Sequence, residues 1–513
     1  MLVSTMTIDP AFRIGEVDPR LYGSFVEHMG RCVYTGIHEP DHPTADEHGF
    51  RRDTADLVRE LGTPLVRYPG GNFVSGYRWE DGIGPVENRP TRLDLAWRSL
   101  ETNHVGVDEF MTWARTVGVE PMMAVNLGTR GIDAARSLVE YCNIASGTYW
   151  SDLRGGSPYG IKTWCLGNEM DGPWQIGHKT AGEYARLALE TAKAMRQVDP
   201  SIELVACGSS GRQMPTFGSW EATVLGETYD AVDYVSLHGY YQQHDDDRDS
   251  FLACATDMDA FIDEVVATAD HVRAVGRHRK RLYLSFDEWN VWYQSRFVGE
   301  TNLEIEQAPR LIEDVYSVTD AVVVGNLLIS LLRHADRVKI GCQAQLVNVI
   351  ATIMTEPGGP AWRQASFHPY ALTTRYGRGT VLRPAITAPT HETARHGEVP
   401  LLDAVAVHSD AGTVLFAVNR SQTQPMTLEV DLRALPALST ATHTVIADDD
   451  PDAVNTAQHP DRVTPPRPRR PETRRRPPPG HPPRPLLEHD PPQLRRPCPR
   501  VRPAGGCCDV PGA

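Results

Sequence analysis

The 513-residue sequence lacks the signals of several large classes of protein. It has no run near the 18 or so apolar residues that mark a membrane-spanning helix. Residues 1–8 alternate like a strand, without the basic start and long apolar centre of a signal peptide. No G-x-G-x-x-G or phosphate-binding loop indicates a nucleotide cofactor. We therefore expect a cytoplasmic protein with no membrane partner and no cofactor.

The cysteines and the charge exclude further classes. The nine cysteines are odd in number and scattered, mostly inside apolar segments, which is typical of reduced, buried thiols. No C-x-x-C pair indicates a metal site, and the acidic run 245–247 lacks the glycine and terminal glutamate of a calcium loop. The formal net charge of −15 argues against nucleic acid as the main partner. We expect no metal and no nucleic acid.

A repeated strand–helix pattern occupies residues 17–378. Eight apolar segments are strand candidates: 21–28, 64–71, 121–128, 161–169, 203–210, 234–241, 281–290 and 339–349. Helical patterns lie between them, at 50–61, 107–117, 132–142, 181–197, 258–275 and 312–334. Eight strands that alternate with helices predict an α/β fold of the (β/α)8 TIM-barrel type. A doubly wound open sheet is the alternative.

From about residue 379 the pattern changes. Short alternating segments separated by turn residues predict a smaller β-sandwich over 379–464. Its expected strands are 381–382, 402–407, 414–418, 426–430 and 443–446, and we expect the N-terminal strand within residues 1–16 to join it. Residues 465–513 contain 16 Pro and 11 Arg without hydrophobic periodicity, which predicts a disordered tail.

Polar residues follow most of the eight barrel strands. The fourth candidate ends in Asn168-Glu169 and the seventh in Asp287-Glu288. Barrel enzymes place their active sites at this end of the strands. Two carboxylic acids there suggest paired carboxylate catalysis, most simply glycoside hydrolysis. The separation of the two carboxyl groups decides between retention and inversion, and the residues alone leave it open.

Six segments together resemble glycoside hydrolase family 51, the α-L-arabinofuranosidases. The segments are LYGSFVEH at 21–28, RYPGGNF at 67–73, LGNEMDGPW at 166–174, SLHGYY at 236–241, SFDEWNVW at 285–292 and AQLVN at 344–348. An isolated Asn-Glu pair is a weak signal, whereas the full ordered set is specific. The resemblance extends to about Thr464. It implies a retaining, exo-acting enzyme that releases terminal arabinofuranosyl residues from arabinan or arabinoxylan oligosaccharides.

The resemblance also implies a role for individual residues. Glu169 would be the general acid/base and Glu288 the nucleophile that forms a covalent arabinosyl-enzyme. Substrate-binding roles fall on Asn168 (sugar 2-hydroxyl), Tyr240 (orienting Glu288), Glu27, Asn72 and Gln345 (other hydroxyls), and Trp97, Trp292 and Trp174 (stacking). Arg67 would neutralise charge near the carboxylates, although a structural ion pair explains it equally well. His28 and His238 are expected to be hydrogen-bonding partners, because two carboxyls already supply acid and base.

Two alternatives stay open. One is an endo-glucanase or a xylosidase on the same barrel, and the other is a catalytically impaired product that only binds sugar. The second arises because the family pattern ends with strands that close the sandwich, whereas this chain changes composition abruptly at Pro465. We interpret that change as a frameshift. The resemblance further implies a homo-oligomer, namely a hexamer.

Overall fold

The computed structural model describes residues 1–435 and 441–466. Eight parallel strands form a closed barrel in the spatial order β10-β11-β12-β3-β4-β7-β8-β9. They are β3 (Gly23–Phe25), β4 (Leu65–Tyr68), β7 (Glu120–Ala124), β8 (Thr163–Leu166), β9 (Glu203–Ala206), β10 (Tyr234–Tyr241), β11 (Tyr283–Val291) and β12 (Val338–Gln343). The barrel closes where Cys342 and Gln343 of β12 pair with Gly23 and Ser24 of β3. The predicted TIM barrel is confirmed, and the open sheet is excluded.

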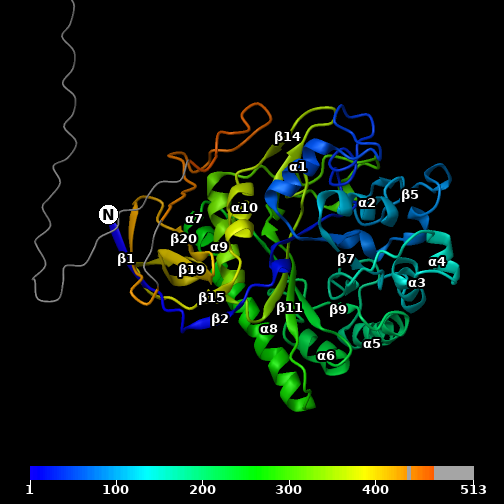
Figure 1. The fold of residues 1–513 in the computed structure, drawn as a ribbon, viewed down its shortest axis with the longest axis horizontal. Helices are drawn as coiled ribbons and strands as arrows, with labels where there is room; N and C mark the ends of the chain where they lie inside the picture. The colour runs from blue at the N-terminus through cyan, green and yellow to red at the C-terminus, as the bar shows by residue number, and fades with distance from the viewer. Residues whose placement is uncertain (436–440, 467–513) are drawn as a thin grey trace, which may run out of the picture.

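Helices surround this barrel (Figure 1). They are α1 (Arg52–Leu61), α2 (Val107–Val117), α3 (Ile132–Asn143), α4 (Tyr149–Arg154), α5 (Ala181–Val198), α6 (Ser219–Thr228), α7 (Arg248–Leu252), α8 (Ala255–Gly276), α9 (Val318–Arg333) and α10 (Phe367–Tyr376). Local sequence signals determine where several of these helices begin or end. Thr180 and Glu183 form a capping box that begins α5, and Gly62 ends α1 in the left-handed region at φ 76°.

The sequence reading of the helices was incomplete. All six predicted helices exist, but the one expected over 312–334 begins only at Val318, because Ser317 and Asp320 form a capping box there. Helices α4, α6, α7 and α10 were missed. The first and third are one or two turns long, too short for a periodicity of 3.6 residues to show.

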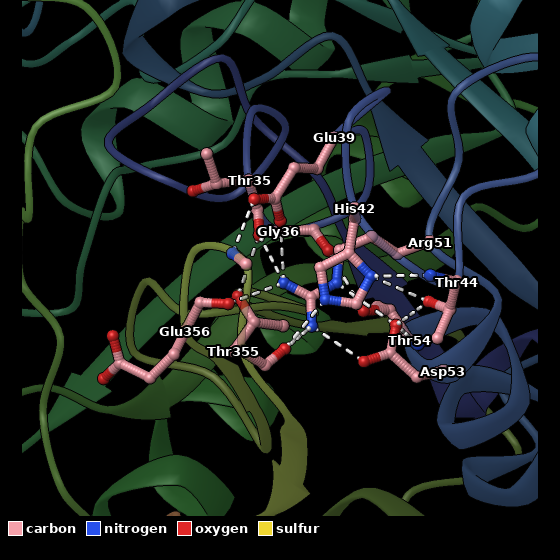
Figure 2. A network of polar contacts seen from close by, with 12 residues as sticks. Thr35, Gly36, Glu39, His42, Thr44, Arg51, Asp53, Thr54, Thr355 and Glu356 are labelled. Carbon is pink, nitrogen blue, oxygen red and sulfur yellow. Dashed lines mark hydrogen bonds and ion pairs between the residues drawn. The ribbon is translucent and has the colours of Figure 1, made fainter.

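A buried arginine fixes the long loop between β3 and α1. The Arg51 guanidinium is fully buried and bonds to the carboxylates of Glu39 and Asp53. It also donates to the carbonyl oxygens of Thr35 and of Glu356, which follows the strand β13 (Ile353–Thr355) (Figure 2). Strand β13 pairs with β14 (Ala361–Arg363). The Arg51 cation thus ties the loop that contains Glu27 to the hairpin β13–β14.

Two small sheets form the second domain, on the left of Figure 1. One contains β16 (Ala385–Thr387), β1 (Leu2–Thr7) and β21 (Met426–Asp431), and the other contains β2 (Arg13–Glu16), β15 (Thr380–Leu382), β19 (Leu402–Ser409) and β20 (Gly412–Asn419). Two further hairpins are separate two-stranded sheets. One pairs β17 (Thr390–Thr393) with β18 (Gly397–Pro400), and the other pairs β5 (Arg92–Leu93) with β6 (Leu100–Glu101) in the segment between β4 and α2. Strand β1 runs parallel to β21, so the prediction that the N-terminal strand joins this domain is confirmed.

The strand predicted at 443–446 is wrong. The described residues from 441 to 450 contain no strand, and Val445 is 43% exposed. Ile446 instead packs against a small apolar cluster that includes Val318, Ala321 and Val463. The segment does alternate, but its Ile446 side chain is partly buried against the start of α9 and does not lie within a sheet.

The division of the chain at residues 16, 378 and 464 stays a prediction. The predicted tail lies, from residue 467 onwards, outside the described residues. Within the part that is described, no helix combines the length and the apolar character needed to cross a bilayer.

Candidate active site

The chain turns sharply where β8 ends, and this turn presents Asn168 and Glu169. Gly167 has φ 91° and Glu169 has φ 45°, both in the left-handed region. A glycine adopts this conformation freely, whereas a glutamate held there is strained. Both Asn168 and Glu169 are nevertheless buried, with 1% and 8% of their surface exposed. The backbone therefore aims two consecutive polar side chains into the barrel mouth.

A bulge in β11 directs Asp287 and Glu288, two further consecutive polar residues, toward the same groups. Ser285 pairs with Ser236 of β10, but Glu288 pairs with His238, so β11 has one residue more than its neighbour over this interval. The register against β12 shifts in the same interval. Successive side chains of a regular strand point to opposite faces, and a bulge breaks that alternation. Here Asp287 and Glu288 both reach the same two groups, Arg67 and His238.

Glu288 is held at both carboxylate oxygens. Arg67 on β4 donates to its Oε1 at 2.6 Å, and the hydroxyl of Tyr240 on β10 donates to its Oε2 at 2.8 Å. The other Arg67 nitrogen donates to Asn168 Oδ1 at 2.7 Å. Burial raises the pKa of Glu288, and the positive charges of His238 and Arg67 oppose that rise.

Glu169 faces Glu288 across the mouth. Its Oε1 contacts His238 Nδ1 at 2.9 Å, and its Oε2 accepts a hydrogen bond from Trp174 Nε1 at 2.7 Å. One carboxylate oxygen of Glu169, one of Glu288 and the His238 ring nitrogen all lie within 4.8 Å of one another. The two carboxyl groups thus share one small, buried space.

His238 contacts three carboxylates. Its Nδ1 also lies 3.5 Å from Glu288 Oε2, and its Nε2 lies 3.2 Å from Asp287 Oδ1. Burial alone would lower the pKa of His238, but the negative charges of Glu288, Asp287 and Glu169 outweigh it and raise the pKa to about 10. Burial acts in the opposite direction on Asp287, and there the charges of Arg67 and His238 leave the pKa below its ordinary value.

A second group of predicted residues surrounds Glu27. Its carboxylate accepts hydrogen bonds from the backbone N–H of Phe73 (2.9 Å), from Trp97 Nε1 (2.9 Å) and from Gln345 Nε2 (3.2 Å). Burial nevertheless raises the pKa of Glu27 to about 8. Gln345 Oε1 is buried and has no hydrogen-bond partner among the described residues. A ligand hydroxyl is the natural donor for such an oxygen.

The remaining predicted residues lie between these two groups. The amide oxygen of Asn72 accepts from Gln175 Nε2 and lies 3.5 Å from Asn168 Nδ2. The ring of Trp292 meets that of Tyr240 edge-on at 5.2 Å, and its buried Nε1 has no partner in the described part of the chain. Trp174 is 47% exposed and covers Glu169 from the solvent side. Tyr240, Trp97, Trp174 and Gln345 thus contact one of the two glutamates or Glu27 directly. Asn72 and Asn168 are connected to Glu288 through Arg67, and Trp292 is connected to it through Tyr240.

We assign no metal to this site. Glu169, His238 and Glu288 are, among the described residues, the group whose ligand atoms lie close enough together to hold an ion. Both Glu288 oxygens, however, already accept hydrogen bonds, one of them from the Arg67 guanidinium. A metal cation would have to enter beside that fixed positive charge. The residues present therefore do not fit a metal.

The sequence analysis missed two residues that contact the predicted site residues. Asp287 was noted only as part of a strand end, and Gln175 was not considered. The Asp-Glu pair in SFDEWNVW was a signal for Asp287, but period-2 alternation would have sent its side chain away from the mouth. The acidic run at 245–247 lies in a solvated turn as predicted, where Asp247 caps α7.

A closed (β/α)8 barrel with two buried glutamates facing each other at the carboxyl ends of its strands defines a glycoside hydrolase. The comparisons with known proteins narrow this class. Residues 57–259 match the model of the α-L-arabinofuranosidase 1 domain, and residues 287–474 match that of the α-L-arabinofuranosidase C-terminal domain.

Individual relatives agree with these matches. The chain is 60% identical over 473 residues to the intracellular exo-α-(1→5)-L-arabinofuranosidase of Streptomyces lividans, covering 91% of this chain and 72% of the relative. It is 58% identical to intracellular exo-α-(1→5)-L-arabinofuranosidase 1 of Bacillus subtilis, covering 89% and 92%. A solved family 51 α-L-arabinofuranosidase from Bifidobacterium longum superposes with a TM-score of 0.88 at 49% identity, covering 90% and 94%. The chain belongs to the family 51 α-L-arabinofuranosidases.

Proposed function

We propose that the chain is a retaining, exo-acting α-L-arabinofuranosidase with Glu288 as the nucleophile and Glu169 as the acid/base. The observation that carries the proposal is the short distance between the two glutamates, whose closest carboxylate oxygens lie within 4.8 Å. Retaining enzymes hold their carboxyl groups roughly 5–5.5 Å apart, whereas inverting enzymes leave about 6.5–9.5 Å for a water molecule. Retention is therefore favoured.

Glu288 is suited to attack. The Arg67 guanidinium stabilises its negative charge, and the Tyr240 hydroxyl fixes the other oxygen. An ionised Glu288 attacks the anomeric carbon of the arabinofuranosyl unit, the bond from that carbon to the leaving oxygen breaks, and a covalent arabinosyl-enzyme forms.

Glu169 transfers the proton in both steps. It first donates its proton to the leaving oxygen, and then removes a proton from the water that hydrolyses the arabinosyl-enzyme. The cluster has two cations, Arg67 and His238, and three carboxyls, Glu169, Asp287 and Glu288. A proton on Glu169 leaves this buried cluster neutral, which is the state required for the first step.

The side chains proposed to bind the furanose hydroxyls are those of Glu27, Asn72, Asn168 and Gln345. Those proposed to pack against the sugar or the leaving group are Trp97, Trp292 and Trp174. The unpartnered Gln345 Oε1 and Trp292 Nε1 support this assignment, because each is a buried polar atom without a partner among the described residues. The names of the relatives support exo action on terminal α-L-arabinofuranosyl residues and an intracellular location. The hexamer stays a proposal from the family resemblance.

A substrate panel tests the proposal. Purified protein is expected to hydrolyse 4-nitrophenyl α-L-arabinofuranoside and to release arabinose from arabino-oligosaccharides, and to act far more slowly on the aryl xyloside and on cellulose. Proton NMR of the first-formed sugar should show the α anomer, which marks retention. Equal or faster hydrolysis of the xyloside or of cellulose would favour the endo-glucanase or xylosidase alternative, and a first-formed β anomer would exclude the retaining mechanism.

A further inference from the structure

Asp287 lies beneath the catalytic glutamates and has no role in the mechanism described so far. Its carboxylate is 1% exposed. Oδ1 lies 3.2 Å from His238 Nε2, and Oδ2 lies 3.7 Å from Arg67 Nε and 3.6 Å from the Cys165 thiol. Asp287 therefore contacts the two cations of the site, one at each carboxylate oxygen.

The environment of His238 determines its protonation state. One ring nitrogen points at Glu169 and Glu288, and the other at Asp287. Neutral imidazole carries a hydrogen on one nitrogen and a lone pair on the other, and a lone pair that faces a carboxylate oxygen is repelled. No hydrogen bond of standard geometry joins His238 Nε2 to Asp287 Oδ1, and neither atom has such a bond to any other described residue. Their 3.2 Å contact is an ion pair when Nε2 carries a proton, whereas an unprotonated Nε2 would turn its lone pair toward the carboxylate oxygen.

We propose that Asp287 is a positioning residue that keeps His238 as an imidazolium cation, and that this cation holds Glu169 and Glu288 together in the mouth of the barrel. This inference rests on the proposed function. It assigns His238 an electrostatic role and not that of a proton shuttle, because a histidine that shuttles protons must release one during the reaction. The bulge in β11 makes the arrangement possible, since it brings Asp287 and Glu288 to the same two cations.

The charged groups around His238 come from four strands. Glu169 follows β8, Asp287 and Glu288 lie on β11, Arg67 lies on β4, and the Tyr240 hydroxyl comes from β10 itself. The negative charges favour the imidazolium and the Arg67 cation disfavours it. Removal of the Asp287 charge takes away the anion that faces Nε2, so the pKa of His238 should fall, and the imidazole should lose its proton at a lower pH.

The test compares Asp287→Asn with the wild-type chain over pH 5–10. We expect the alkaline limb of kcat/KM for 4-nitrophenyl α-L-arabinofuranoside to lie about one pH unit or more lower in the variant. At a pH above the alkaline limbs of both proteins, the variant should therefore be about tenfold slower than the wild-type chain. Asp320→Asn is the matched control, because Asp320 is also 1% exposed but caps α9 and bonds to Tyr293. Its alkaline limb should stay in place even if it lowers stability. An unchanged limb in Asp287→Asn would overturn the proposal.

A second measurement needs neither the substrate nor the Asp287→Asn variant. Nitrogen-15 NMR of histidine-labelled wild-type protein, with His238 assigned by comparison with His238→Gln, reports the proton on each ring nitrogen. We expect both nitrogens to be protonated at pH 8, where exposed histidines are neutral. An unprotonated ring nitrogen at pH 8 would overturn the proposal. If the wild-type chain fails to hydrolyse arabinofuranosides while both nitrogens are protonated, the proposed function fails and the charge state assigned to His238 stands.

Discussion

The barrel and the sandwich bury their apolar residues to different degrees. The barrel strands are almost wholly enclosed, and Leu284 of β11 has no exposed surface. In the sandwich, Met6, Ile8 and Leu382 are buried, but the residues packed against them, including Leu415 and Leu428, are only partly buried. Helices cover the barrel, whereas two thin sheets face each other in the sandwich. The region that contains the proposed active site is therefore the densely packed one, as the fixed geometry of two facing glutamates requires.

Charge is used differently in the two regions as well. The barrel mouth buries Glu169, Glu288 and Asp287 together with Arg67 and His238. Away from its contact with α9, the sandwich has surface charges, such as the exposed Glu429 of β21 and Arg433, which pairs with Asp431. Buried charges must be paired in number and position, because an unpaired buried charge is costly. Ion pairs at the surface contribute little to stability. The same type of substitution should therefore have a much larger effect on activity or stability where the charge is buried than where it is at the surface.

The largest difference between the two regions is expected in kcat, when a glutamate is replaced by glutamine. Glu288→Gln removes the proposed nucleophile, and we expect kcat for aryl arabinofuranosides to fall by more than about 10³-fold with the fold retained. Glu429→Gln in β21 is the control and should leave kcat unchanged. Kinetics together with circular dichroism checks both variants. Residual activity in Glu288→Gln above about a tenth of wild type would show that another group is the nucleophile.

The contact between the two regions should show the next largest effect. Helix α9 packs against β19 and β20. There Arg420, which is 3% exposed, donates to Asn326 of α9 at 2.8 Å and to Asp403 of β19 at 2.9 Å. Arg420→Met leaves Asp403 short of one buried partner, at a cost of roughly 3 kcal/mol.

Urea denaturation followed by tryptophan fluorescence measures this loss. Arg433→Met is the control, because its side chain is 73% exposed and its loss should cost less than about 1 kcal/mol. Equal midpoints for the two variants would mean that the buried contact between α9 and the sandwich does not stabilise the chain.

The smallest difference concerns packing alone. Leu284→Ala in the barrel should cost about 4–5 kcal/mol, near the upper end for a leucine whose surroundings cannot relax. Leu382→Ala in the sandwich should cost about 2–3 kcal/mol, because its half-buried neighbours can move into the space. Denaturant midpoints of the two variants test the order. A sandwich variant as unstable as the barrel variant would show that the two cores are equally rigid.

Much of this molecule could be predicted from its sequence. The eight barrel strands were found because buried parallel strands are continuous apolar runs, and their polar ends named Glu169 and Glu288 as a pair. The sandwich was predicted less well. Strands β16 to β18 were missed, because their three or four residues include too few apolar side chains to show an alternation. The segment 443–446 alternates without forming a strand.

The sequence by itself determined the class of fold, the ordered motifs and the identity of the two facing glutamates, because apolar periodicity and residue type are local properties. Only the tertiary structure decided that Asp287 and Glu288 reach the same cations, and that His238 lies among three carboxylates. The physical reason is the bulge in β11. An extra residue in a ladder depends on how two neighbouring strands pair, and no pattern within one strand contains that information.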